Sequence, residues 1–279
     1  MSGSATQASP QALIQARGLA IGYGGSALLE RLDFEVPEGG ITAILGGSGT
    51  GKSTLIKTLA GLLPPIAGSL ELHAEARRPG LRPGAPNFGM VFQGGALLGS
   101  MTLLQNVALP LQRWTDLPPA AIELEARAKL RLVGLSGFEN HPVDALSGGM
   151  RKRAGVARGL ALDPPLLFLD EPSAGLDPHT MAELDRLLIA LNASLGITMV
   201  LVTHELASLF RIADNALLLE REARGIIARG APRELSERRD DLRVLRFFHP
   251  DEAFEQEATD LHAGRASSPS CGPLLDDLP

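Results

Sequence analysis

A glycine-rich segment between residues 46 and 53 has the residue types and spacing of a phosphate-binding loop. It reads Gly46-Gly47-Ser48-Gly49-Thr50-Gly51-Lys52-Ser53, with Thr54 next, and fits the pattern G-x-x-x-x-G-K-[ST]. Glycines let the backbone wrap closely enough for consecutive N–H groups to point at one phosphate, and a following helix adds its positive dipole end. Lys52 would then reach the β- and γ-phosphates, and the Ser53 hydroxyl would ligate Mg²⁺. The segment therefore predicts a nucleotide site; a glycine loop that binds no nucleotide is the alternative.

The segments around this loop have the patterns of the strand and helix that it needs. Ile41 to Leu45 is a short apolar run typical of a buried strand, and Thr54 to Ala60 indicates a helix. Ahead of them, Leu13 to Tyr23 and Leu32 to Val36 alternate loosely around a glycine turn, which predicts a small antiparallel sheet. Tyr23 lies at that turn, where its ring could stack on a base; packing on the sheet is the alternative.

Acidic and imidazole side chains directly follow two further apolar runs. Asp170-Glu171 ends the run Leu166 to Leu169, and His204 follows Met199 to Thr203. Strands that are apolar at every position are buried on both faces, which favours a parallel sheet covered by helices. Because ligands bind at the carboxyl ends of such strands, we expect these three side chains beside the phosphate loop. For His204, a buried neutral histidine is the alternative.

Periodicity and the positions of proline and glycine predict the remaining elements. Strands are predicted at Gly68 to Leu72, at Phe88 to Phe92 before Gln93, and in a closing hairpin of Leu217 to Glu220 and Gly225 to Ala228. Helices are predicted at 118–133, 151–162 and 178–195. Ser147-Gly148-Gly149 precedes the second helix, where a plain serine N-cap is the alternative to a functional role.

Composition bounds the classes of protein that this chain can be. With 279 residues, 44% of them hydrophobic, it can bury a full core as one domain, or one domain with a lobe. The net charge is −6, and residues 250–279 hold seven acidic residues against Arg265, so the rest is neutral. A neutral body argues against bulk binding to nucleic acid. The only cysteine, Cys271, excludes a disulfide framework and a cysteine metal cluster, and the first ten residues lack a signal-peptide pattern, which indicates a cytosolic chain.

The two ends of the chain differ from its middle. Residues 1–12 are small and polar and are predicted to be disordered, and residues 250–279 are predicted to form an acidic, flexible tail. One folded domain is therefore expected over residues 13–249. Just before the tail, Phe247-Phe248 is predicted to be an exposed apolar pair.

Two stretches between residues 77 and 112 have unusual compositions. Arg77 to Asn87 carries three prolines, two glycines and three arginines, and predicts a solvated connection rather than a binding patch. Pro83 to Gln112 contains no charged residue, but its prolines, glycines and amides argue against a membrane-spanning helix. Within it, Gly94 to Leu111 is predicted to dock an apolar partner, with Leu98 and Leu103 as exposed positions; burial inside the chain is the alternative.

Taken in order, these residues resemble the motif set of an ABC-type ATPase. The matches are Tyr23 for the adenine-stacking aromatic, residues 46–53 for Walker A, Gln93 for the Q-loop, Ser147-Gly148-Gly149 for the signature, Leu166 to Asp170 for Walker B, Glu171 for the catalytic carboxylate, Ser173 to Asp177 for the D-loop and His204 for the switch histidine. The resemblance covers about residues 13–235. Any one motif alone would be weak, but six of them in order, namely Walker A, the Q-loop, the signature, Walker B with its carboxylate, the D-loop and the switch histidine, are very specific.

The resemblance implies an α/β fold and a set of ligands. The fold is that of a P-loop ATPase with a RecA-like mixed-sheet core, an N-terminal antiparallel β subdomain and a helical signature subdomain over about residues 94–162. The implied cofactors are ATP and Mg²⁺. ATP would be bound by Tyr23, residues 46–54, Gln93 and residues 147–149. The signature would cap ATP on a second subunit, so that two sites form in a head-to-tail dimer.

The roles of the site residues follow from the same resemblance and from the needs of phosphoryl transfer. The reaction requires charge neutralisation and a positioned water. Mg²⁺ would be held by Ser53, Gln93 and, through water, Asp170. The implied catalytic residues are Lys52, Glu171, which would orient or deprotonate the water, and His204, which would hydrogen-bond the γ-phosphate.

Within that family the sequence looks most like the ATPase of Mla/Mce-type phospholipid transporters. The match rests on Phe92 to Leu97, Asn106 to Leu111, Met150, Arg153 and Leu242 to Phe247, whereas Gly47 and the expanded Arg77 to Asn87 loop depart from it. It implies three further partners: an integral permease, a Mce-domain protein and a small STAS-domain subunit. The expected location is peripheral, on the cytoplasmic face of the inner membrane. An ATPase for another transported substrate and a soluble ABC ATPase acting on DNA or ribosomes are the alternatives.

Overall fold

Two sheets organise the chain in the computed structural model, which describes residues 12–75 and 77–255. The smaller sheet is antiparallel, in the order β2-β1-β4, and the larger has the order β5-β6-β7-β3-β8-β9. All neighbours in the larger sheet pair in parallel except β8 and β9. The strands are β1 (Ala12–Tyr23), β2 (Ser26–Pro37), β3 (Ile41–Leu45), β4 (Ala67–Leu72), β5 (Phe88–Val91), β6 (Leu166–Asp170), β7 (Thr198–Val202), β8 (Asn215–Glu220) and β9 (Gly225–Gly230). The predicted antiparallel sheet and the buried parallel strands are confirmed.

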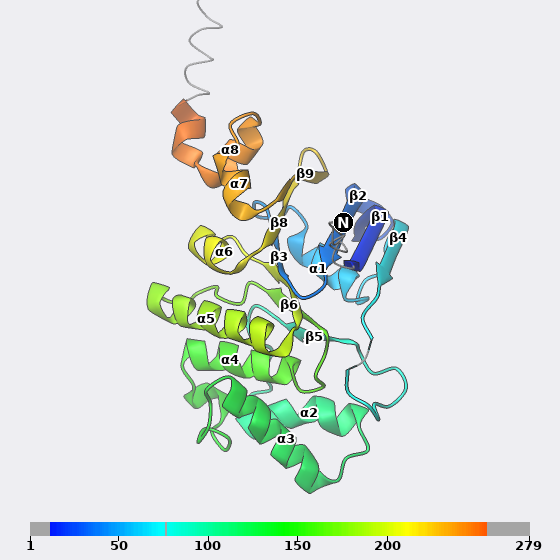
Figure 1. Cartoon of the computed structure of the whole chain (residues 1–279), viewed down its shortest axis with the longest axis vertical. Coiled ribbons are helices and arrows are strands. Elements are labelled where there is room, and N and C mark those ends of the chain that lie inside the picture. The colour runs from blue at the N-terminus through cyan, green and yellow to red at the C-terminus, as the bar shows by residue number, and fades with distance from the viewer. Residues whose placement is uncertain (1–11, 76, 256–279) are drawn as a thin grey trace, which may run out of the picture. The chain divides into compact units, whose positions relative to one another are not determined.

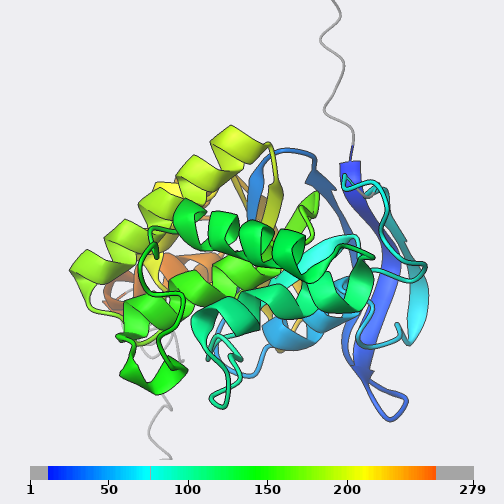
Figure 2. The same cartoon turned by 90° about the horizontal axis from the view of Figure 1, so that it is seen from below.

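The helices include a group of three that pack on one another, α2, α3 and α4. Figure 1 shows this group in green, and Figure 2 shows the curved antiparallel sheet, in blue and cyan, to one side of it. The helices are α1 (Lys52–Leu59), α2 (Leu103–Trp114), α3 (Pro119–Leu132), the 3-10 turn η1 (Val143–Ala145), α4 (Gly148–Gly159), α5 (Pro178–Leu195), α6 (Leu206–Ile212), α7 (Pro232–Glu237) and α8 (Leu242–Phe248).

Helix α1 packs into a single apolar cluster that draws on both sheets. It contributes Leu55, Ile56 and Leu59, which are buried against side chains from β1, β2, β3, β6, β7 and β8. Burial of each such side chain contributes roughly 1.5–3 kcal/mol. The cluster therefore fixes the direction of α1, and with it the end of the loop that precedes the helix.

Helix α4 and strand β5 approach each other closely. A Cβ at Gly89 of β5 would lie 2.1 Å from the carbonyl oxygen of Gly159 in α4, which is closer than real Cβ atoms come to a carbonyl oxygen. Only glycine fits at Gly89. The contact holds β5 against α4.

The connection predicted for Arg77 to Asn87 is confirmed, since every residue in it is exposed or half-buried, but Arg78 anchors it to other segments. The side chain of Arg78 is 13% exposed, and its guanidinium donates to Asp163 at 2.8 Å and to Glu125 at 3.0 Å. Leu81 forms an antiparallel bridge with Thr115. The sequence could not show these contacts because both carboxylates lie far along the chain from Arg78.

The uncharged run contains a helix that was not predicted. α2 follows Thr102, whose side chain accepts a hydrogen bond from the Gln105 N–H in a capping box. Leu103 is 0% exposed, so its prediction as an exposed docking position is wrong, whereas Leu98 is 45% exposed. Among the described residues, no helix combines the length and hydropathy needed to cross a membrane.

The chain divides into two compact units, with the division between Leu235 and Ser236. In the second unit Phe248 is 5% exposed, so the prediction of an exposed Phe247-Phe248 pair is wrong for this residue. Its ring meets that of Phe247 edge-on, with centroids 5.1 Å apart. Residues 250–255 are helical, although the flexible tail was predicted to begin there, and Ala12 belongs to β1. The disorder predicted for residues 1–11 and 256–279 lies outside the described residues.

Because Leu98 is exposed and Leu103 is buried, a charge introduced at each position should lower the free energy of unfolding by different amounts. Leu103→Glu is expected to lower the free energy of unfolding by about 3–5 kcal/mol because an unpaired carboxylate would enter the core. Leu98→Glu should change it by no more than about 0.5 kcal/mol, since its carboxylate stays in water. Chemical denaturation of the full-length variants measures both. Equal losses at the two positions would contradict the burial described here.

Candidate nucleotide site

The phosphate-loop residues connect β3 to α1 and follow a path that requires glycine. Gly46 has φ +145°, and a Cβ there would lie 2.7 Å from the carbonyl oxygen of Leu219. At Gly51, with φ +99°, a Cβ would lie 2.9 Å from the side chain of Leu28. Thr50 closes the loop by donating its hydroxyl to the Gly47 carbonyl at 3.0 Å. The loop is therefore a tight turn at the N-terminus of a helix.

Lys52 points its ammonium group back into this turn. The side chain is buried, and Nζ donates to the carbonyl oxygens of Gly46 and Gly47 at 2.8 and 2.7 Å. Burial lowers the pKa of Lys52, and the nearby charges of Glu171 and Asp170 oppose that effect. A phosphate would offer the ammonium charged acceptors, which form stronger hydrogen bonds than neutral carbonyls.

The start of α1 also fits an anion. Its N-cap, Gly51, offers no side-chain acceptor, and the first turn of a helix leaves N–H groups without intrahelical partners. These N–H groups and the helix dipole favour negative charge at that end. The loop, the buried ammonium and the helix start together fit the phosphates of a nucleotide.

Ser53 and Asp170 bring two oxygen ligands together across the site. The Ser53 hydroxyl donates to Oδ1 of Asp170 at 3.2 Å. Burial raises the pKa of Asp170, and the charge of Glu171 adds to this, while the Ser53 hydrogen bond opposes it. Mg²⁺ commonly takes one or two protein oxygens and completes its shell with phosphate and water. The pair fits Mg²⁺ on those terms. Among the described residues, no group of three or more His, Cys, Asp or Glu could hold a metal ion.

Glu171 lies between Gln93 and His204. Its Oε2 accepts a hydrogen bond from the Gln93 side-chain amide at 3.0 Å, and its Oε1 lies 3.4 Å from Nδ1 of His204. The His204 side chain is 53% exposed, so the alternative of a buried histidine is excluded. Glu171 has φ +47°, a left-handed conformation that non-glycine residues rarely adopt. The fold thus brings together three predicted site residues from the ends of β5, β6 and β7.

Tyr23 lies beside the phosphate loop, whereas the signature residues are at the start of α4 and contact α5. Tyr23 is 55% exposed, with its hydroxyl 3.5 Å from that of Thr54 in α1, so its ring is free beside the loop as predicted. Ser147 accepts from the Met150 N–H as the N-cap of α4. A Cβ at Gly149 would lie 2.5 Å from Thr180 of α5. The signature therefore packs toward α5 within its own subunit.

The sequence reasoning missed Lys152, a buried lysine on α4. Its ammonium donates to the main-chain carbonyls of Gln93 and Glu171. The signal was present in the sequence: Lys152 lies three residues after Gly149 and four before Val156, a spacing that places all three on the buried face of the helix.

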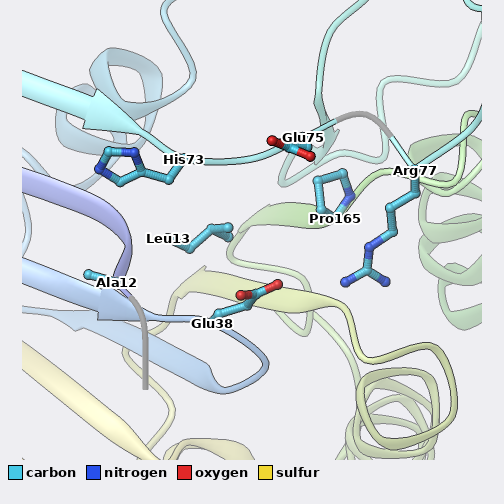
Figure 3. A pocket seen from close by; sticks show the side chains of 7 residues that line it. All are labelled: Ala12, Leu13, Glu38, His73, Glu75, Arg77 and Pro165. Carbon is cyan, nitrogen blue, oxygen red and sulfur yellow. The ribbon is translucent and has the colours of Figure 1, made fainter. Parts of the chain in front are cut away.

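A hollow of about 400 Å³ lies elsewhere, beside Pro165 at the other end of β6 from Asp170 (Figure 3). Glu38, Glu75 and Arg77 lie around it. The guanidinium of Arg77 donates to the carbonyls of Leu195 and Gly196 at 2.6 and 2.7 Å. None of the predicted site residues lines this hollow, so it is separate from the candidate nucleotide site.

Comparison with known families agrees with this geometry. The profile of the ABC transporter family matches residues 29–174, which is more than half of the chain and includes the phosphate loop and Glu171. The chain belongs to the ABC transporter family. It is an ABC ATPase with an antiparallel β sheet, a mixed core sheet and a group of helices that carries the signature.

Curated relatives of this ABC ATPase carry two kinds of name. The "Probable ribonucleotide transport ATP-binding protein mkl" of Mycobacterium leprae is 38% identical, over 85% of this chain and 68% of that protein. The "Intermembrane phospholipid transport system ATP-binding protein MlaF" of Escherichia coli K12 is 37% identical, over 85% of this chain and 88% of that protein. MlaF of Haemophilus influenzae is 36% identical, with 90% of its length covered. The chain thus spans about two thirds of Mkl and most of MlaF.

Solved structures of ATP-binding cassettes share the fold of this ABC ATPase. CbiO1 of Clostridium perfringens, part of the ABC transporter complex cbiONQ, is 27% identical with a TM-score of 0.70, over 88% of this chain and 99% of that one. A dimeric cassette in a post-hydrolysis state with ADP and Pi is 26% identical with a TM-score of 0.67, over 78% and 98%.

The raised pKa of Asp170 predicts a pH-dependent gain in stability on its replacement. A group whose pKa is raised by folding contributes stability below its unfolded pKa and loses that contribution as the pH rises through the folded pKa. At pH 8 and without nucleotide, Asp170→Asn should therefore stabilise the protein, within the ~0.5–2 kcal/mol that single stabilising substitutions commonly give. The gain should shrink as the pH falls toward 4. Thermal melts across this range measure it.

Asp177→Asn is the matched control for this measurement. Hydrogen bonds from Thr180 lower the pKa of Asp177, which is the opposite direction. Asp177→Asn should therefore bring no gain at pH 8. A stabilising effect of Asp170→Asn that was independent of pH would contradict the burial cost assigned to its carboxylate.

Proposed function

We propose that this ABC ATPase hydrolyses ATP to drive phospholipid transport in the bacterial envelope. One observation carries the choice of substrate: MlaF is matched over 88% of its length. Mkl, named for ribonucleotide transport, is equally similar but is matched over only 68%. Ribonucleotide transport is therefore the second candidate, and the match across most of MlaF favours the first.

We infer the roles of the site residues from the resemblance to ABC ATPases together with their contacts in the structure. Tyr23 stacks on the adenine, residues 46–54 hold the phosphates through their N–H groups, and the Lys52 ammonium neutralises phosphate charge. Ser53, Gln93 and, through water, Asp170 would hold Mg²⁺, which would supply positive charge to the transferred phosphoryl group. Glu171 accepts a proton from the attacking water, and His204 donates to the γ-phosphate.

A second copy of the chain completes the site in this proposal. Ser147, Gly148 and Gly149 stand at the N-terminus of α4, where the nearest neighbours of the two glycines are Leu176 and Thr180, and there they can cap a nucleotide bound by the partner. The dimeric cassette solved with ADP and Pi supports this arrangement. The two sites of a head-to-tail dimer would then close together.

The membrane partners are proposed on the resemblance to MlaF. They are an integral permease, a Mce-domain protein and a small STAS-domain subunit, with this chain peripheral on the cytoplasmic face of the inner membrane. The neutral body gives no support to a nucleic-acid partner.

The stretch just before α2 is the proposed dock for the permease. Asn106 is buried, accepts from the Leu98 N–H at 2.7 Å and donates to the carbonyls of Leu98 and Thr102 at 3.1 and 3.0 Å. The backbone of this stretch is thus held from inside, while the Leu98 side chain stays exposed. A fixed, exposed apolar side chain in a stretch without charged residues is typical of an interface.

Substitutions of Lys52 and Glu171 separate ATP binding from hydrolysis. Lys52→Ala should abolish ATP binding, because it removes the ammonium that meets the phosphates. Glu171→Gln should bind ATP normally, lose about 10²–10⁴-fold in turnover, and accumulate an ATP-bound dimer. Nucleotide binding, hydrolysis and sizing of the full-length chain measure these effects. Glu75→Gln, at an exposed position remote from the site, is the control and should keep native turnover. If Glu171→Gln were as active as this control, the catalytic role assigned to Glu171 would be wrong.

Purification of the assembled transporter tests the substrate and the dock. The tagged chain should recover a permease with bound phospholipid, identified by mass spectrometry. Leu98→Glu should lower recovery of the permease at least about tenfold, or ~1.4 kcal/mol, while the control Leu62→Glu, another exposed leucine, leaves it unchanged. A complex that carries ribonucleotide cargo and no phospholipid would replace the first candidate with the second. Full recovery with Leu98→Glu would contradict the dock.

A further inference from the structure

Lys152 is a buried cation close to the carboxylates of the site, and no motif assigns it a role. Its side chain lies on the inner face of α4, and its pKa is lowered by burial, an effect that the charges of Glu171 and Asp170 oppose. Burying an ammonium is costly unless its donors are satisfied. Here they are directed at two main-chain carbonyls, those of Gln93 and Glu171, the latter at 3.2 Å.

Lys152, Gln93 and Glu171 form a closed ring of hydrogen bonds. The ammonium donates to the Gln93 carbonyl, the Gln93 side-chain amide donates to Oε2 of Glu171 at 3.0 Å, and the Glu171 carbonyl accepts from the ammonium. Each member touches the other two. Removing Lys152 therefore takes two of the three links and leaves the Gln93 side chain as the only remaining link.

The backbone of Glu171 depends on such support. Its φ of +47° costs roughly 1–3 kcal/mol relative to an ordinary conformation, and such residues persist when their surroundings fix them. The Glu171 N–H is held by the Val202 carbonyl at 3.0 Å, and its carbonyl accepts from Lys152 and from the Ala174 N–H, each at 3.2 Å. The two main-chain groups on either side of the Cα are thus both anchored, which sets the direction of the carboxylate.

We propose that Lys152 is a positioning residue for ATP hydrolysis. It joins α4 to Gln93, two residues after β5, and to the strained Glu171, so that the carboxylate is aimed at the attacking water. It acts through Glu171 and Gln93 and touches no nucleotide. The inference rests on the catalytic role proposed for Glu171. It predicts that Lys152 affects the chemical step and leaves ATP affinity almost unchanged.

Arg158 offers a matched comparison on the same helix. Its guanidinium donates to the carbonyls of Gly95 and Ala96 at 2.9 and 2.6 Å, so it also ties α4 to the segment after β5. No contact with Glu171 is found for it among the described residues. If holding this segment to α4 were all that mattered, the two cations would be equivalent.

The kinetic test uses the full-length chain with Lys152→Met, Lys152→Arg and Arg158→Met. Lys152→Met keeps the length of the stem without its donors, and kcat should fall about 10- to 100-fold, the scale expected of a misplaced catalytic group. The KM for ATP, and ATP affinity measured directly, should stay within about threefold. Lys152→Arg should recover most of kcat, because a guanidinium can donate to two carbonyls. Arg158→Met should lower kcat no more than about threefold.

Hydrogen exchange on the nucleotide-free variants gives a readout that is independent of activity. Lys152→Met should speed exchange of the Glu171 amide and of the amides just after Gln93, while β3 and α1 remain protected as in the wild type. Arg158→Met should speed exchange only in the segment after Gln93. Exchange of the Glu171 amide at the wild-type rate in Lys152→Met would overturn the proposal, even if Lys152→Arg folded poorly.

The kinetic outcomes separate this inference from the proposed function. Equal losses of kcat in Lys152→Met and Arg158→Met, or a loss confined to ATP affinity, would overturn the positioning role alone. Native turnover in Glu171→Gln would overturn the catalytic assignment, whatever Lys152→Met does. A kcat defect with intact affinity, rescued by arginine and absent from Arg158→Met, supports both.

Discussion

Burial of α1 between two sheets is the interaction on which the geometry of the site depends. The helix is too short to be stable alone in water, so its direction is set by Leu55, Ile56 and Leu59 in the shared apolar cluster. The phosphate loop ends where that helix begins, so the loop inherits its position from the core. This explains why an antiparallel sheet with no acid or base in the chemistry belongs to the same folding unit as the site.

The site concentrates charges that the fold alone does not favour. Burial lowers the pKa of Lys52 and raises that of Asp170, so burial disfavours the charged form of each group. Glu171 adds a strained backbone at the same place. A phosphate chain with its metal would relieve the first two costs, because it offers acceptors to the ammonium and a cation to the carboxylate. Ligand binding should therefore be coupled to the rigidity of this region.

Sequence reasoning could predict the parts of the site that are fixed by local rules. The loop spacing located Lys52 and Ser53, and the apolar strands located Asp170, Glu171 and His204 because parallel strands end at one edge. It failed where long-range packing decides. Nothing local distinguishes buried Leu103 from exposed Leu98, because the difference comes from the helices that cover α2. Arg78 looks like a surface cation until its distant acceptors are brought to it, and the helical spacing of Lys152 signals its burial but not its acceptors.

The buried side chain of Asn106 fixes the backbone of the stretch that ends at Thr102 without using the exposed side chains of that stretch. Because one buried amide satisfies main-chain groups of Leu98 and Thr102, the path of the backbone does not depend on the exposed side chains. Those side chains can change from one relative to another with little effect on folding. Divergence between transporters could therefore proceed by substitutions on this surface, with the ATPase machinery behind it conserved.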